Sequence, residues 1–201
     1  MPPATKEVWN EPLVNAETPP PPSPSDAALL ARARAGDHAA FHTLVDRHAP
    51  GLYATAVALV GRAADAEDLL QETFTGALRG LERFEGRSSV KTWLTAILLR
   101  RVAMHRRRAG RKDNRLVSLD AASQTTTDGP PTTAAVDARL DVIDAIGGLR
   151  PEHREVLVLR ELQGLTYDEI ADTLGVPRGT VESRLFRARR ALRERLGDYL
   201  D

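Results

Sequence analysis

The sequence predicts an all-α fold in which a flexible linker joins two small helical domains. Apolar residues recur at helical spacing in both halves of the chain, and no segment shows the alternation that is typical of a strand. Hydrophobic residues make up 42% of the 201 residues but aromatic residues only 4%, so Ala, Leu and Val must fill the core, as in small helical bundles. Residues 113–135 are polar, contain a Pro pair and separate the two helical parts.

The first 25 residues are Pro-rich and are predicted to form a disordered or polyproline-II arm. They lack the charged-then-apolar pattern of a secretion signal, and the chain has no run of 18 apolar residues. We therefore expect a soluble, cytoplasmic protein without direct membrane insertion. The chain has no cysteine, which excludes disulfides and Cys-ligated metal sites.

Residues 26–112 contain the pattern of a first helical domain. Asp26 is a plausible N-cap for a short helix that ends at Gly36, and Asp37 can cap a second helix. This second helix is predicted to end near His48, because Pro50 stops it. A third apolar segment follows and ends at Gly61.

Two longer helices complete this domain. The first begins at Asp65 and continues to about Arg83, and the second, capped by Ser88 or Ser89, continues to Arg108. The apolar stripe of the first helix consists of Leu70, Phe74, Ala77 and Leu81. Beyond the linker, residues 136–201 show helical patterns again and form the second domain.

The formal net charge of zero conceals an uneven distribution of charge. Residues 26–112 hold 15 Lys and Arg against 9 Asp and Glu, and residues 113–150 hold 3 against 6. Residues 178–195 alone hold 7 basic against 2 acidic residues. Two basic regions thus flank an acidic stretch, which is typical of a protein that contacts nucleic acid through local patches.

The second domain contains the pattern of a helix-turn-helix. Thr166 and Glu169 form a capping box at the start of a short helix, and Gly175 is placed to end it in a left-handed turn. The following helix, predicted over residues 177–195, has an apolar stripe and an Arg-rich opposite side. The second helix of such a motif enters the major groove of DNA. The alternative is an Arg-rich surface helix without a ligand.

The residues of this second helix divide by their expected contacts. Those near its N-terminus would reach base edges, namely Arg178, Thr180, Glu182, Ser183 and Arg184. Farther along, Arg187 and Arg190 would contact phosphates and set the register on the duplex.

Two segments resemble known sequences of one family. Residues 65–108 resemble region 2 of the sigma-70 family, in its extracytoplasmic-function (ECF) branch, and residues 164–196 resemble region 4 of the same family. The order and separation of the two segments also agree with the family. The resemblance implies a transcription initiation factor that binds core RNA polymerase, directs it to promoters and aids their opening. It implies no cofactor and no catalysis by the chain itself.

The resemblance also implies partners and contact residues in the first domain. The matching segment would bind the clamp helices of the largest polymerase subunit through Asp68, Leu69, Leu70, Gln71 and Glu72, while the flap region would be a further polymerase contact. The alternative is a solvated acidic start of a helix, which the helix dipole favours.

The resemblance assigns recognition of the −10 promoter element to the segment after residue 84. The predicted DNA contacts are Arg87, Ser88, Ser89, Lys91, Trp93, Arg100, Arg101, Arg107 and Arg108. Within this segment the loop of residues 84–89 would capture a flipped base. Phe84 and Trp93 can equally be core anchors. The recognition helix in the second domain would read the −35 element, although Glu182 stands where relatives often carry Lys or Arg.

Regulation and competing functions complete the expectations. ECF sigma factors are commonly controlled by an anti-sigma factor, and a long linker would allow such a protein to rearrange the two domains. The acidic linker either imitates nucleic acid inside the polymerase or is a solvated tether. The alternative function is a stand-alone helix-turn-helix regulator that binds its operator unaided. His38 and His42 have the spacing of metal ligands but lack a third ligand, so no metal site is expected.

Overall fold

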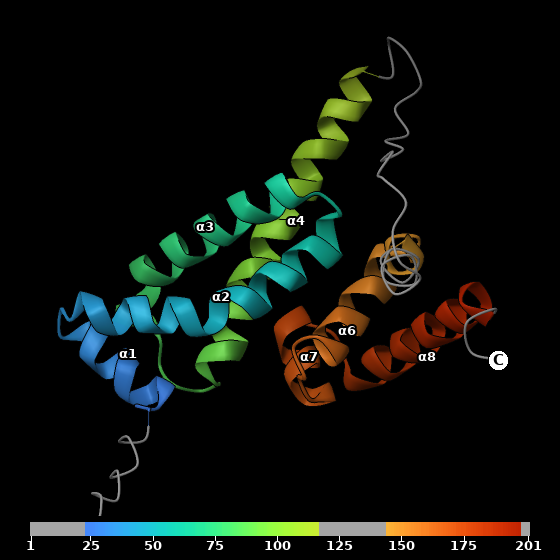
Figure 1. Cartoon of the computed structure of the whole chain (residues 1–201). Helices are drawn as coiled ribbons and strands as arrows, with labels where there is room; N and C mark the ends of the chain where they lie inside the picture. Colours follow the sequence, from blue (N-terminus) through green and yellow to red (C-terminus); the bar gives the residue numbers. More distant parts are fainter. Residues whose placement is uncertain (1–22, 117–143, 198–201) are drawn as a thin grey trace, which may run out of the picture.

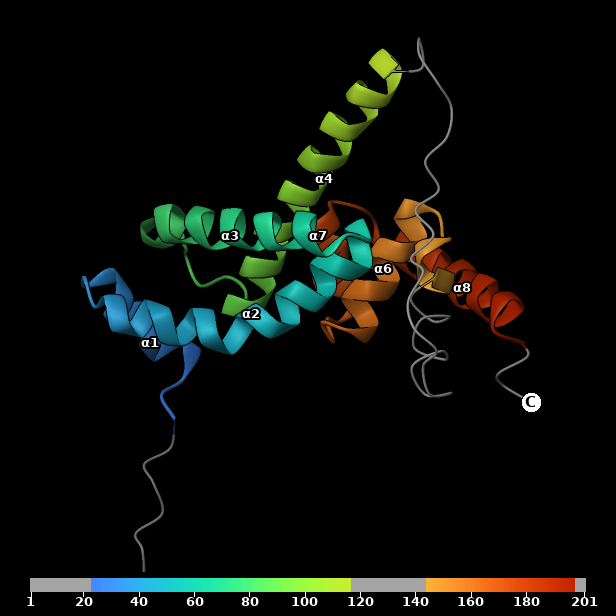
Figure 2. The same ribbon diagram turned by 45° about the horizontal axis from the view of Figure 1, so that its top comes forward.

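The computed structural model describes residues 23–116 and 144–197, and all of its regular elements in these ranges are helices. They form two domains that lie side by side in both views (Figures 1 and 2). The first consists of α1 (Asp26–Arg34), α2 (His38–Val60), α3 (Ala63–Gly80), the short 3-10 helix η1 (Leu81–Arg83) and α4 (Val90–Leu116). The second consists of α6 (Pro151–Glu161), α7 (Tyr167–Leu174) and α8 (Arg178–Arg195). The predicted all-α fold with a helix-turn-helix is confirmed.

Helix α2 is longer than the sequence pattern predicts. Asp37 caps it by accepting the backbone N–H of Ala40 at 3.1 Å, as expected. The helix then continues through Pro50 to Val60, so the predicted end near His48 is wrong. Leu44 and Leu52 are both buried and lie on either side of the proline. Packing of this continuous apolar face outweighs the hydrogen bond that proline removes.

Helix α3 buries only part of its predicted apolar stripe. Its buried residues are Ala66, Leu69, Thr73 and Ala77. Of the predicted stripe, Ala77 and Leu81 are buried, whereas Leu70 and Phe74 are only half-buried at the edge of the core. Thr73 can occupy the core because its hydroxyl donates to the carbonyl of Leu69 at 2.6 Å.

Helix α4 begins at its predicted cap and ends beyond its predicted end. The hydroxyl of Ser89 accepts the backbone N–H of Thr92 at 3.0 Å. The first half of the helix is buried in the domain, and Leu98 and Val102 are completely covered. The helix continues to Leu116, past residue 112 where the sequence analysis placed the domain boundary. Both views show this last part projecting away from the body (Figures 1 and 2).

The second domain follows the predicted helix-turn-helix closely. Thr166 and Glu169 form the complete capping box of α7, and Gly175 adopts the left-handed conformation with φ 65°. Helix α8 begins after Pro177 and buries Val181, Leu185 and Ala188 against α6 and α7. The predicted Pro-rich arm, apart from residues 23–25, and most of the predicted linker lie outside the described residues.

The two domains pack against each other through one continuous apolar core. This core includes Leu52 and Leu59 of α2 and reaches Val156 and Leu159 of α6 without a break. Helix α6 lies against α2, and α7 lies against the start of α4. The sequence predicts two domains but gives no signal for this contact.

Candidate nucleic-acid and partner-binding surfaces

The recognition helix α8 has a clear inner and outer side. Val181, Leu185 and Ala188 mark the inner side, and the residues opposite them at 100° per residue face outward. The outer side carries Phe186, Arg187 and Arg190, which are all exposed. It therefore combines positive charge with one large apolar side chain.

Several of the predicted base-reading residues form ion pairs or hydrogen bonds with other residues of the second domain. Arg178 lies 2.9 Å from Asp168 and 3.0 Å from Glu182, so both Arg178 and Glu182 are partners in one ion-pair network. The hydrogen bond to Glu182 and the charge of Asp168 raise the pKa of Arg178 further. The hydroxyl of Ser183 donates to the carbonyl of Thr180 at 3.0 Å. The two ion pairs of Arg178 are at the surface, so DNA can compete for them.

Arg184 lies on the flank of α8 that faces α6, and it is half-buried. Its charge acts on Glu155 of α6, together with that of Arg106 from α4. Burial raises the pKa of Glu155, and the two arginines only partly offset this effect. Arg184 is thus a half-buried positive charge on the side of α8 toward α6, whereas Arg187 is open to solvent.

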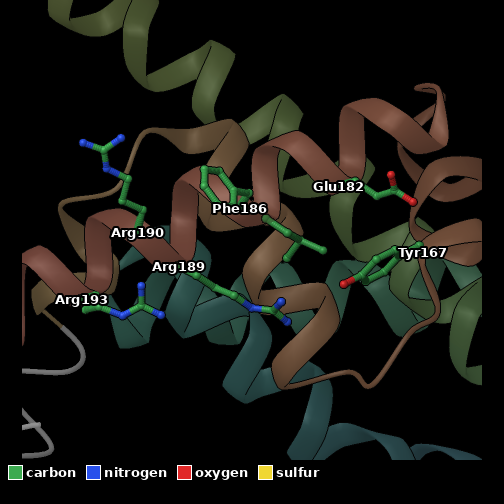
Figure 3. Close-up of a pocket in the computed structure, with 7 residues that line it drawn as sticks. Tyr167, Glu182, Phe186, Arg189, Arg190 and Arg193 are labelled. Atoms are coloured by element: carbon green, nitrogen blue, oxygen red, sulfur yellow. The ribbon is translucent and has the colours of Figure 1, made fainter.

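Phe186 is the residue that the sequence analysis missed. Its side chain is 70% exposed, the largest exposure among the large hydrophobic residues described. It borders a groove of about 330 Å³ that runs along α8 beside Tyr167. Figure 3 shows Phe186 on the outer side of the helix, with Arg190 and Arg193 nearby and Arg189 extending along the groove. The sequence contained a signal for this residue, because a large apolar side chain on an otherwise polar side of a helix indicates a contact surface.

The loop between η1 and α4 presents polar side chains to solvent. Arg87 and Ser88 are exposed, and Arg87 lies 3.0 Å from Glu85. Ser89 is exposed too, although its hydroxyl caps α4. The rings of Phe84 and Trp93 pack against each other with centroids 4.8 Å apart.

These two aromatic residues anchor the loop to the domain. Phe84 is buried and Trp93 is half-buried, which agrees with the core-anchor alternative. Beside the loop, a cavity of about 600 Å³ opens between α1 and the start of α4. Leu30 and Arg34 of α1 line one side of this cavity, and Ser88 and Ser89 line the other.

The basic residues of α4 differ in their exposure. Lys91, Arg100, Arg107 and Arg108 are exposed. Arg101 instead turns toward α3, where its guanidinium lies 3.6 Å from the carboxylate of Glu72. The exposed Arg107 and Arg108 make the projecting part of α4 positively charged.

The predicted polymerase-binding segment of α3 lies on two sides of the helix. Asp68, Gln71 and Glu72 are exposed and adjacent. Leu69 is only 4% exposed and belongs to the core, and Leu70 is half-buried at its edge. The accessible part of the segment is therefore the acidic and amide-bearing part.

The ranges 23–116 and 144–197 contain no group of three or more side chains that could hold a metal ion. Within the same ranges, no helix is long and apolar enough to cross a membrane.

An all-α chain with a helix-turn-helix, an Arg-rich recognition helix and a second basic helical domain belongs to the class of DNA-binding transcription proteins. The comparisons specify the class. Sigma-70 region 2 matches residues 44–112, and sigma-70 region 4 matches residues 139–192. The chain belongs to the sigma-70 family, in its ECF branch, and is a sigma factor rather than a stand-alone regulator. Members of this family are non-catalytic transcription initiation factors.

Relatives of known name agree with this assignment. The ECF RNA polymerase sigma-E factor of Haemophilus influenzae is 31% identical over 181 residues, which cover 86% of this chain and 95% of that protein. The ECF RNA polymerase sigma factor SigE of Mycolicibacterium smegmatis is 37% identical over 169 residues. That match covers 82% of this chain but 65% of SigE, just under two thirds of its length.

A solved structure shares the fold. The sigma factor RpoE from Bartonella quintana, in complex with the anti-sigma factor NepR, superimposes with a TM-score of 0.66 at 29% identity. The match covers 78% of this chain and 96% of that one.

Proposed function

We propose that this sigma factor binds core RNA polymerase, reads the −35 promoter element through α8 and captures the −10 element through the first domain. The observation that carries this proposal is the outer side of α8, where Phe186, Arg187 and Arg190 are all exposed. Arginines on this side can contact phosphates and base edges, and the phenyl ring can contact thymine methyl groups.

The first domain supplies the −10 contacts in this proposal. Opened DNA needs a pocket for an unstacked base and cations for its backbone. The cavity beside Ser88 and Ser89 has room for a base, and Arg87 and Lys91, the nearest cations in the sequence to these serines, are exposed. The exposed arginines of α4 extend the same basic surface along the projecting part of the helix.

The polymerase contact is assigned to Asp68, Gln71 and Glu72 on α3. Their exposure and acidic character fit docking on a basic partner surface, such as the clamp helices of the largest polymerase subunit. Leu69 supports this surface from inside, because it is buried. The flap region of the polymerase is assigned to the second domain.

Inhibition by an anti-sigma factor forms part of the proposal. It is supported by the fold shared with RpoE, which was solved in complex with the anti-sigma factor NepR. We place the protein in the cytoplasm, where the polymerase acts, and assign all nucleotidyl transfer to the polymerase. A chain that stayed fully active in its native cell, with no inhibitor co-purifying, would contradict the anti-sigma assignment.

The test is transcription in vitro from fragmented genomic DNA, with cognate core polymerase in the presence and absence of this chain. Discrete transcript starts that appear only with the chain are expected, and aligning their upstream sequences yields the −10 and −35 elements. Tight binding of duplex DNA by the chain alone, without any added starts, would instead support a stand-alone regulator.

A further inference from the structure

We propose that Arg34 of α1 is a positioning residue for the −10 loop, defined as residues 84–89, and that α1 thereby forms part of the −10 site. The match to sigma-70 region 2 begins at residue 44, so α1 (Asp26–Arg34) lies before the matched residues. The inference rests on the proposed function, because it concerns how the loop that is assigned to the −10 element is held ready for an unstacked base.

The guanidinium of Arg34 joins α1 to both ends of η1. Its Nε donates to the carbonyl of Leu81, the first residue of η1, at 2.9 Å. Its Nη2 donates to the carbonyl of Phe84, the residue that directly follows η1. A helix of only three residues can satisfy few of its own carbonyls. The planar fork of a guanidinium supplies donors to two of them in one fixed geometry.

Phe84 connects η1 to the −10 loop. Its backbone N–H donates to the carbonyl of Leu81 at 3.3 Å, which is the same carbonyl that Arg34 binds. The ring of Phe84 is buried and packs against Trp93. The guanidinium carbon of Arg34 lies over this ring, 6.0 Å from its centroid, at the outer limit of a cation–π contact. Arg34 therefore contacts both the backbone and the ring of the first loop residue.

A separate contact fixes the other end of the −10 loop. The hydroxyl of Ser89 accepts the backbone N–H of Thr92 and caps α4. Between the two ends, the chain turns at Gly86, which has the left-handed φ of 72°. Arg87 and Ser88 are exposed in this turn. The side chains that are assigned to DNA thus lie between one end fixed by α1 and another fixed by α4.

Arg34 also lines the cavity of about 600 Å³ that has room for the unstacked base. Leu30 and Arg34 line one side of it, and Ser88 and Ser89 line the other. Because Arg34 binds the start of the loop, the separation of the two sides depends on this arginine. A pocket that is already formed binds its ligand more tightly than one that must be ordered during binding. Loss of Arg34 should therefore weaken capture of the −10 element, although other residues supply the contacts to DNA.

The test compares Arg34→Ala and Arg34→Lys with the parent chain, all in full length. Arg34 is exposed, so its replacement leaves the buried residues of α1 in place. Lysine keeps the charge but lacks the fork, so Arg34→Lys should behave like Arg34→Ala. Arg32→Ala is the matched control, because Arg32 lies on the same helix and pairs with Asp37 at 2.7 Å. It removes an arginine and an ion pair away from the loop.

The first measurement is amide hydrogen exchange of residues 81–93 in the free chain, followed by mass spectrometry. We expect faster exchange in both Arg34 variants, because the N–H of Phe84 donates to a carbonyl that Arg34 holds in place. Arg32→Ala should exchange like the parent chain in this segment. Unchanged exchange in Arg34→Ala would overturn the positioning role, and this result depends on neither polymerase nor DNA.

The second measurement uses the factor bound to core polymerase and a promoter identified by mapping transcript starts. The probes are a dye-labelled single strand that carries the −10 element and a duplex that carries the −35 element. The affinity for the −10 strand should fall about tenfold in both Arg34 variants, while the affinity for the −35 duplex and for core polymerase stays that of the parent chain. Arg32→Ala should bind both probes like the parent chain. Equal affinity of all variants for the −10 strand would overturn the proposal.

Salt dependence separates positioning from direct contact with DNA. A positioning residue neutralises no phosphate, so the logarithm of the binding constant for the −10 strand should fall with the logarithm of the salt concentration equally steeply in Arg34→Ala and the parent chain. A slope that is shallower by about 0.7, or binding restored by lysine, would make Arg34 a phosphate contact and overturn the proposal. The proposed function fails by a different result, in which the parent chain itself adds no transcript starts.

Discussion

The hydroxyl of Thr166 accepts the backbone N–H of Glu169 at 3.2 Å, while the carboxylate of Glu169 accepts the backbone N–H of Thr166 at 2.8 Å. This reciprocal pair satisfies two donors that the first turn of α7 would otherwise leave free. The same carboxylate reaches across to Thr92 of the first domain. The start of the helix-turn-helix is thus fixed both locally and by the domain contact.

Removal of the cap should destabilise the second domain. Thr166→Ala is expected to lower the free energy of unfolding by about 1 kcal/mol, the usual value of an N-cap side chain. Chemical denaturation followed by circular dichroism measures this change. Thr43→Ala is the control, since Thr43 lies exposed within α2 and its hydroxyl only bonds the carbonyl of Ala39. An equal loss of unfolding free energy in both variants would show that removal of the cap does not cause the loss in Thr166→Ala.

The cap should also make stability depend on pH in the acid range. The backbone hydrogen bond from Thr166 holds the pKa of Glu169 below its ordinary value of 4.5, with smaller contributions from the hydroxyls of Thr166 and Thr92. Because the folded pKa is depressed, the stabilising effect is present above the unfolded pKa and is lost as the pH falls through the folded one.

Glu169→Gln isolates this contribution. The variant should be less stable than the parent chain by a constant amount above about pH 5, and the difference should shrink below about pH 4. Thermal unfolding across this pH range provides the measurement. A difference that stays constant down to pH 3 would mean that Glu169 does not titrate with folding.

Arg187 and Arg184 should behave differently when each is replaced by alanine. Arg187 is exposed, so Arg187→Ala should change the free energy of unfolding by less than about 0.5 kcal/mol. The slope of the logarithm of the DNA-binding constant against the logarithm of the salt concentration should become shallower by about one. Arg184 is half-buried near Glu155, so Arg184→Ala should also lower the melting temperature. The binding of a promoter duplex by the polymerase-bound factor is measured at several salt concentrations for both variants, and their melting temperatures are compared with that of the parent chain. Identical behaviour of the two variants would contradict the distinction.

Phe186 should contribute to sequence discrimination rather than to stability. Because its side chain is 70% exposed, Phe186→Ala should leave the melting temperature unchanged. Affinity for the specific −35 duplex should fall, while affinity for unrelated DNA should stay the same, since the ring carries no charge for phosphate. Competition binding with the two duplexes measures the ratio of the affinity for the specific −35 duplex to the affinity for unrelated DNA. Equal losses for both duplexes would assign Phe186 a general role.

The acidic face of α3 should control polymerase affinity. Replacing Asp68 and Gln71 together by alanine is expected to weaken binding of core polymerase about tenfold or more without changing the preferred promoter sequence. The control is the double variant His42→Ala and Thr43→Ala on the exposed side of α2. Affinity is measured by titration of labelled chain with core polymerase. A changed start-site preference would indicate that this face acts on DNA instead.

The sequence by itself determined the helical fold, the two-domain order and the helix-turn-helix. These depend on local chemistry: the capping box at Thr166, the left-handed turn at Gly175 and the apolar spacing of α8 each act within a few residues. The same locality explains the correct caps at Asp37 and Ser89.

Only the tertiary structure decided which of the candidate residues are accessible. Local pattern ends a helix at Pro50, but long-range packing of α2 continues it. Likewise, helical spacing alone did not distinguish the half-buried Arg184 from the exposed Arg187, nor did it indicate the exposure of Phe186. The contact between Gln163 and Thr55 joins residues 108 positions apart in the sequence. Such contacts depend on how whole surfaces fit together, and no periodicity in a single sequence records that fit.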